Sequence, residues 1–76
     1  MEKLLNLLKE IREDVDFENE KKLIDEEILD SFDVVAIVGE LCEEYNITIT
    51  VEDMEAANFN SAEAMLALVN RLQKKL

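Results

Sequence analysis

The stretch Leu29-Asp30-Ser31-Phe32-Asp33 holds the start of the chain's central amphipathic segment. An aspartate side chain can accept the free backbone N–H groups at a helix start, and an acid three positions later can accept the N–H of the capping residue. Asp30 and Asp33 have this spacing, so the pattern predicts a helix that begins at Ser31. Its expected apolar stripe consists of Phe32, Val35, Val38, Leu41, Cys42 and Tyr45.

A helix is also expected near the N-terminus, because Leu4, Leu8, Ile11 and Val15 recur at three- and four-residue spacing. This spacing predicts about four turns. Residues 16–29 break the period, and we interpret them as a long loop with at most one helical turn, a kind of segment that is often functional. The loop is expected to be held to the core by Phe17, Leu23, Ile24, Ile28 and Leu29.

Two further helices are expected after an extended connection at residues 46–50, which has no second strand to pair with. Thr50 followed by Asp53 predicts a short helix of about two turns that ends near Asn58. Asn60 followed by Glu63 predicts the last helix in the same way. The inner face of that helix and its basic end are expected at Ala64, Met65, Leu68, Val69 and Leu72, and at Arg71, Lys74 and Lys75.

These elements predict an all-α fold: a four-helix bundle with three long helices, one short helix and a long loop between the first two. A chain of 76 residues has room for one hydrophobic core, so we expect a single domain over residues 1–76. So short a chain also leaves little space for a deep catalytic pocket, and the sequence contains no histidine to act as a general base or metal ligand. We therefore expect no enzyme activity, no catalytic residue and no metal site.

Charge gives the clearest indication of partners. The net charge is −11, and no lysine or arginine lies between Lys22 and Arg71. A field of this sign repels nucleic acid and attracts basic protein surfaces. The apolar runs are too short to span a membrane, and we find no signal peptide, so a cytoplasmic location is expected. We also expect the chain to be a monomer. The single cysteine, Cys42, lies on an apolar stripe and is interpreted as a buried filler.

The sequence resembles the acyl carrier protein family, which includes peptidyl, aminoacyl and D-alanyl carriers. The resemblance covers nearly the whole chain. It rests on the Asp30-Ser31 pair at a helix start, on Glu43-Glu44-Tyr45, on Ile47-Thr48-Ile49 and on Asn58-Phe59-Asn60-Ser61. It implies an acyl-carrier-like bundle that carries acyl or aminoacyl groups as thioesters on a covalent 4'-phosphopantetheine arm.

By position, the resemblance implies that Ser31 is the attachment residue and that Asp30 belongs to the attachment motif. The arm would come from coenzyme A through a separate magnesium-dependent phosphopantetheinyl transferase. A phosphate at this position would lie close to the positive end of the helix dipole. Docking of basic surfaces on partner enzymes is expected at Asp33, Glu40, Glu43 and Glu44.

Three positions differ from many carriers of fatty-acid synthesis. Ala36 stands where an acid is common, Gly39 where a larger apolar residue is common, and Phe32 replaces leucine, as in D-alanyl carriers. Gly39 also disfavours the helix, which indicates close packing or the approach of a partner. These differences favour a freestanding carrier in a specialised pathway, loaded by an adenylating ligase and served by acyltransferases or synthases.

Two alternatives remain open on the sequence alone. One is a weak calcium site, because five acids fall at positions resembling those of an EF-hand loop: Asp14, Asp16, Glu18, Glu20 and Asp25. Asn19 replaces the glycine of such a loop, and an aspartate replaces its final glutamate. The other alternative is an acidic helical interaction module without a prosthetic group, in which Ser31 has no role beyond the helix start.

Overall fold

The computed structural model describes residues 1–74. They form four helices: α1 (Glu2–Ile11), α2 (Ser31–Tyr45), α3 (Ala56–Phe59) and α4 (Ala62–Lys74), with a short 3₁₀ turn, η1 (Val51–Asp53), before α3. No strand occurs in this part of the chain. The predicted all-α class, with three long helices and one short one, is confirmed. None of the helices within residues 1–74 has the length and apolar character needed to cross a membrane.

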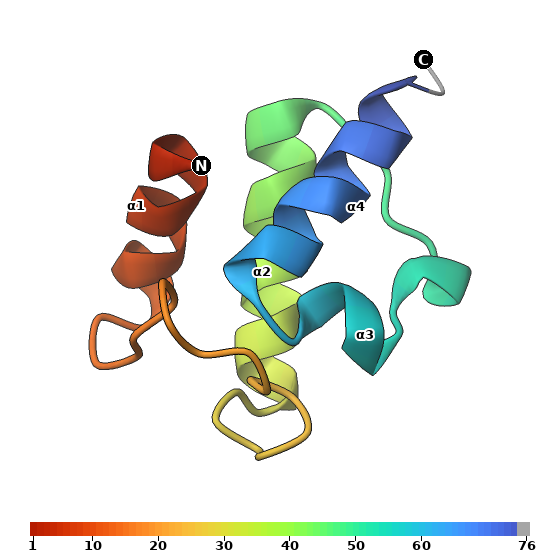
Figure 1. Cartoon of the computed structure of the whole chain (residues 1–76). Helices are drawn as coiled ribbons and strands as arrows, with labels where there is room; N and C mark the ends of the chain where they lie inside the picture. Colours follow the sequence, from red (N-terminus) through yellow and green to blue (C-terminus); the bar gives the residue numbers. More distant parts are fainter. Residues whose placement is uncertain (75–76) are drawn as a thin grey trace.

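The three long helices pack around one hydrophobic core. Helix α1 lies beside α2, α4 crosses α2, and the short α3 leads directly into α4 (Figure 1). The long loop passes beneath the helices in this view and returns to the start of α2 at one end of the bundle. Ser31 is the first residue of that helix. The most deeply buried side chains are Leu4, Leu8, Phe17, Leu23, Ile37, Leu41, Phe59, Met65, Leu68 and Val69.

Helix α1 is shorter than predicted. It ends at Ile11, and Arg12 leaves the helical conformation with φ −139° and ψ 89°. Val15, which the spacing assigned to the helix, is buried from the loop instead. The physical reason is the composition after Ile11: Asp14 and Asp16 have low helix propensity, and Asp14 pairs with Arg12 across a turn rather than along a helix.

The long loop is held to the core as predicted. Phe17, Leu23 and Leu29 are buried, and Ile24 and Ile28 pack against the same core. The loop contains turns closed by backbone hydrogen bonds, such as the Glu26 N–H to the Lys22 carbonyl at 2.9 Å, but no helix.

The buried face of α2 differs from the predicted stripe. Ile37 and Leu41 are buried, with Val34, Val38 and Tyr45 packed against them. Phe32 and Val35, which the prediction placed inside, are 84% and 64% exposed. The cause is the run from Val34 to Val38, where apolar residues occupy all sides of the helix and no polar residue marks the outer face.

Gly39 lies on the exposed surface of α2. A Cβ atom at this position would have no neighbour within 4 Å in residues 1–74 apart from the adjacent residues and the backbone of α2 itself. Close packing within the chain, one of the two explanations that the sequence offered for this glycine, is therefore wrong for the described residues.

The C-terminal half departs from the prediction in two places. The helix expected from Thr50 to Asn58 is split, because η1 ends at Asp53 and α3 begins only at Ala56. The last helix begins after Ser61, whose hydroxyl accepts the Ala64 N–H at 3.1 Å, and not after Asn60. Its buried face is formed by Ala62, Met65, Leu68, Val69 and Leu72, while Ala64 is half-buried. Arg71 and Lys74 lie in its last turn as expected, and Lys75 falls outside the described residues.

Candidate phosphopantetheine attachment site

Ser31 is the first residue of α2, and its side chain is exposed. The Asp30 carboxylate accepts the Asp33 backbone N–H at 2.9 Å, and the Asp33 carboxylate accepts the Asp30 backbone N–H at 3.3 Å. This reciprocal capping box confirms the predicted helix start. It fixes the backbone on both sides of Ser31 and leaves the serine itself accessible from solvent.

Two backbone donors beside this hydroxyl remain available. The first N–H groups of a helix have no carbonyl partner within it. Here the capping box uses the Asp33 N–H, and the Val34 N–H donates to the Asp30 carbonyl at 3.1 Å. The N–H groups of Ser31 and Phe32 make no hydrogen bond within residues 1–74. Free amides at the positive end of a helix suit a phosphate oxygen, so these residues fit a phosphodiester attached at this point.

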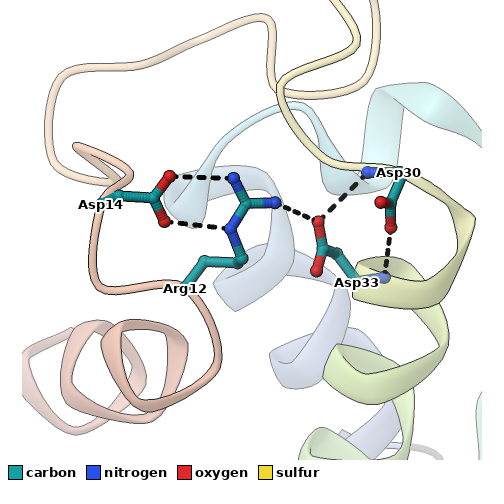
Figure 2. A network of polar contacts seen from close by, with 4 residues as sticks. All are labelled: Arg12, Asp14, Asp30 and Asp33. Carbon is teal, nitrogen blue, oxygen red and sulfur yellow. Dashed lines mark hydrogen bonds and ion pairs between the residues drawn. The ribbon is translucent and has the colours of Figure 1, made fainter.

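An arginine from the loop after α1 reaches the start of α2. Figure 2 shows the Arg12 guanidinium between two carboxylates. Its Nε and Nη2 atoms each donate to Asp14 at 3.0 Å, and its Nη1 atom donates to Asp33. The hydrogen bonds to Asp14, followed by the one to Asp33, raise the pKa of Arg12 above its ordinary value. The same bonds from Arg12 are the main cause of a lowered pKa at Asp14.

The four acids predicted to dock partners fall into two groups. Asp33 is paired with Arg12, and its side chain is only 14% exposed. Glu44 lies 3.2 Å from the ammonium group of Lys3, which also lies over the ring of Tyr45. By contrast, Glu40 and Glu43 are exposed and form no ion pair within residues 1–74. The part of α2 that faces solvent next to Ser31 is therefore apolar, with Phe32 and Val35, and its free acids lie farther along the helix.

A shallow apolar hollow of about 80 Å³ lies between α2 and α3. It is lined by Ile24, Val34, Met54, Glu55, Ala56 and Phe59.

Cys42, expected to be a buried filler, is only half-buried.

The five acids of the calcium alternative do not converge. Asp14 is occupied by Arg12, and Asp25 accepts a hydrogen bond from Asn60. Within residues 1–74, no group of three or more histidine, cysteine, aspartate or glutamate side chains is arranged to hold a metal ion. The loop therefore gives this alternative no support.

Sequence reasoning missed Arg12 as part of the site. Its contact with Asp33 joins residues 21 positions apart, and only the folded path of the loop brings them together. The one signal in the sequence is chemical: Arg12 is one of only two arginines in the chain, and arginine suits paired carboxylates.

The fold and the site together define a small helical domain with an exposed serine at a helix start whose free backbone N–H groups can bind an anion. The family described as "Phosphopantetheine attachment site" matches residues 2–69, and the chain therefore belongs to this family. No curated protein and no solved structure matches the chain. Its cofactor is 4'-phosphopantetheine, attached covalently. Domains of this kind are generally non-catalytic, and their role implies contact with a phosphopantetheinyl transferase and with enzymes that use the arm.

Proposed function

We propose that this chain is an acyl or aminoacyl carrier protein in which the Ser31 hydroxyl is esterified by the phosphopantetheine arm. The observation that supports this most directly is the position of Ser31: it is exposed at the first residue of α2, beside two backbone N–H groups without partners in residues 1–74. The arm supplies the thiol that holds intermediates as thioesters, and the protein supplies attachment, orientation and recognition.

The only other serine in the chain, Ser61, is a poor candidate for attachment. It is 9% exposed, and its hydroxyl is already used by the Ala64 N–H at the start of α4. Access by a transferase would require this end of α4 to open. Ser31 requires no such change, because its surroundings are already exposed.

The chain's own residues contribute no activating base at Ser31. The sequence contains no histidine, and the carboxylates of Asp30 and Asp33 are used in the capping box. The base and the magnesium ion are accordingly assigned to the transferase, which acts on coenzyme A. We further propose that residues 1–76 act as one carrier domain, a cytoplasmic monomer in a specialised pathway, loaded by an adenylating ligase.

Partner docking is proposed along α2 through Asp33, Glu40, Glu43 and Glu44. The exposure of Glu40 and Glu43, without an ion pair in residues 1–74, supports direct contacts with basic surfaces. For partners that use the attached arm, Asp33 would have to exchange Arg12, and Glu44 would have to exchange Lys3, for a cation of the partner. The transferase, by contrast, would meet Asp33 still paired with Arg12. Surface ion pairs contribute little free energy, so such an exchange costs little for Glu44.

The test is the covalent modification itself. The purified chain is incubated with coenzyme A, magnesium and a broad-specificity phosphopantetheinyl transferase, and its intact mass is recorded. We expect one adduct with the mass of phosphopantetheine on the wild-type chain and on Ser61→Ala, and none on Ser31→Ala. An adduct that persists in Ser31→Ala, or no adduct with several active transferases, would overturn the proposal.

A further inference from the structure

Four residues form a continuous network of polar contacts that runs from the segment directly after α1 to Asp30, the residue before Ser31. Asp14 holds the guanidinium of Arg12 through two hydrogen bonds of 3.0 Å, Arg12 donates to Asp33, and Asp33 accepts the Asp30 N–H at 3.3 Å (Figure 2). The Arg12 side chain is 30% exposed and that of Asp33 is 14% exposed, so the contact between these two residues is partly shielded from water. Shielded pairs of this kind are screened by salt less than fully exposed ones.

The arrangement makes the conformation of Asp33 dependent on Arg12. Two carboxylates, those of Asp30 and Asp33, lie within one turn at the start of α2. Without a cation between helix and loop, their mutual repulsion favours turning Asp33 outward, where water solvates it. The Asp30 N–H would then lose its acceptor, and one half of the capping box would open.

We propose that Arg12 is a positioning residue for modification of Ser31. It acts through Asp33, which in turn fixes the backbone of Asp30, the residue that precedes the modified serine. This inference rests on the proposed function, because it assumes that Ser31 is the attachment residue. Within residues 1–74, the Arg12 side chain donates to Asp14 and Asp33 and not to Ser31. It sets the geometry and the charge of the helix start that the transferase meets.

A second ion pair in the same loop provides a matched control. Lys21 donates to Glu63 at the start of α4, and both of these side chains are more than half exposed. Replacement of Lys21 by glutamine removes the same charge from the same loop and also breaks a contact between loop and helix. It leaves the polar contacts that connect Asp14, Arg12, Asp33 and Asp30 intact. A general effect of net charge or of loop mobility would therefore be seen in both variants.

The experiment measures kcat and KM for modification of the wild-type chain, Arg12→Gln, Arg12→Lys, Lys21→Gln, Asp33→Asn and the double variant Arg12→Gln/Asp33→Asn. We expect kcat/KM to fall roughly three- to tenfold in Arg12→Gln, the order expected for loss of a partly exposed charge-assisted hydrogen bond. The loss should be mainly in kcat, because the docking acids Glu40 and Glu43 lie farther along α2 and form no contact with Arg12. The kcat/KM of Arg12→Lys should lie between those of the wild type and Arg12→Gln. The kcat/KM of Lys21→Gln should match that of the wild type.

The double variant tests the route of the effect. If Arg12 acts through Asp33, its replacement changes little once Asp33 is already asparagine, so the two losses are strongly non-additive. Amide hydrogen exchange of the unmodified chain gives a readout that does not depend on the transferase. Exchange at the Asp30 N–H should be faster in Arg12→Gln than in the wild type and unchanged in Lys21→Gln.

The outcomes separate this inference from the proposed function. Ser31→Ala that is still modified, or a wild-type chain that is never modified, sinks the proposed function and the inference with it. Wild-type kinetics in Arg12→Gln, an equal loss in Lys21→Gln, or an Arg12 effect that persists in full in the Asp33→Asn background overturns the inference alone. Should Arg12→Gln fold poorly, Arg12→Lys and the exchange at Asp30 decide the same question.

Discussion

The backbone carbonyl of Asn60 accepts the N–H of Leu23 at 2.9 Å, joining the end of α3 to the middle of the long loop. The side chain of the same asparagine accepts the N–H groups of Ile24 and Asp25 at 3.0 and 3.1 Å and donates to the Asp25 carboxylate at 3.2 Å. One residue therefore satisfies three consecutive backbone donors of a loop that has no helix of its own. This explains why Asn60 is not the cap of α4.

Replacement of Asn60 by alanine should lower the free energy of unfolding by about 2 kcal/mol, because two loop N–H groups lose their acceptor and one of them is part-buried. Urea unfolding followed by circular dichroism measures this change. Asn70→Ala is the matched control, since Asn70 is exposed on α4 and makes no side-chain hydrogen bond within residues 1–74. Equal stabilities of the two variants would contradict the role assigned to Asn60.

The features that the sequence predicted correctly depend on neighbours a few residues apart. Asp30 and Asp33 are three residues apart, and their capping box forms as expected. Thr50 and Asp53 have the same spacing, and Asp53 accepts the Thr50 N–H at 3.2 Å, although the helix after them is broken. The same local geometry, together with the family resemblance, is what allows Ser31 to be proposed as the attachment residue. Local hydrogen bonds of this kind need little from the rest of the fold.

The features that could not be predicted depend on how distant segments meet. The exposure of Phe32 and Val35 is decided by the packing of α1 and α4 on one side of α2, because the helix is apolar on all sides at this point. The pairing of Arg12 with Asp33 is decided by the path of the loop. Neither the period of the apolar residues nor the spacing of the charges contains this information.

Glu27 occupies the left-handed region of backbone conformation, with φ 56°. This conformation is unfavourable for a residue with a Cβ atom, whereas asparagine tolerates it. Glu27→Asn should therefore raise the free energy of unfolding by about 0.5 kcal/mol, and Glu27→Val should lower it. Thermal unfolding of both variants checks the sign.

Glu27→Asn also removes one negative charge. Glu26→Gln removes the same charge at the neighbouring residue and therefore serves as the control. Glu26 is the exposed neighbour and does not have a positive φ. A gain in Glu26→Gln as large as that in Glu27→Asn would show that relief of charge repulsion, and not backbone conformation, is responsible.

Hydrogen bonding to Lys21 is the first cause, and its charge the second, of a lowered pKa at Glu63. A carboxylate with a folded-state pKa below its unfolded value stabilises the fold above the unfolded pKa, about 4.3 for glutamate, and loses this contribution as pH falls through the folded value. The wild type should thus exceed Glu63→Gln in stability by more at pH 7 than at pH 3. Urea unfolding of both chains at the two pH values measures the difference. A difference that is the same at both pH values would contradict a charge-dependent contact.

Gly39 lies on the exposed surface of α2, and within residues 1–74 a Cβ atom here would meet only the adjacent residues and the backbone of its own helix within 4 Å. Alanine at an exposed helix position is more favourable than glycine by about 1 kcal/mol, because glycine loses more backbone freedom on folding. Gly39→Ala should therefore raise the free energy of unfolding by about this amount. Chemical unfolding of the variant beside the wild type measures the change.

Ala36 lies one turn earlier on the same exposed side of α2. Ala36→Gly should lower the free energy of unfolding by a similar amount, which would show that helix propensity is being measured. The described residues thus give no reason for glycine at position 39, so close approach of a partner is the explanation that remains to be tested. If so, Gly39→Leu should lower kcat/KM for modification or for loading although it stabilises the helix. Unchanged kinetics with every partner enzyme tested would exclude close approach at this position.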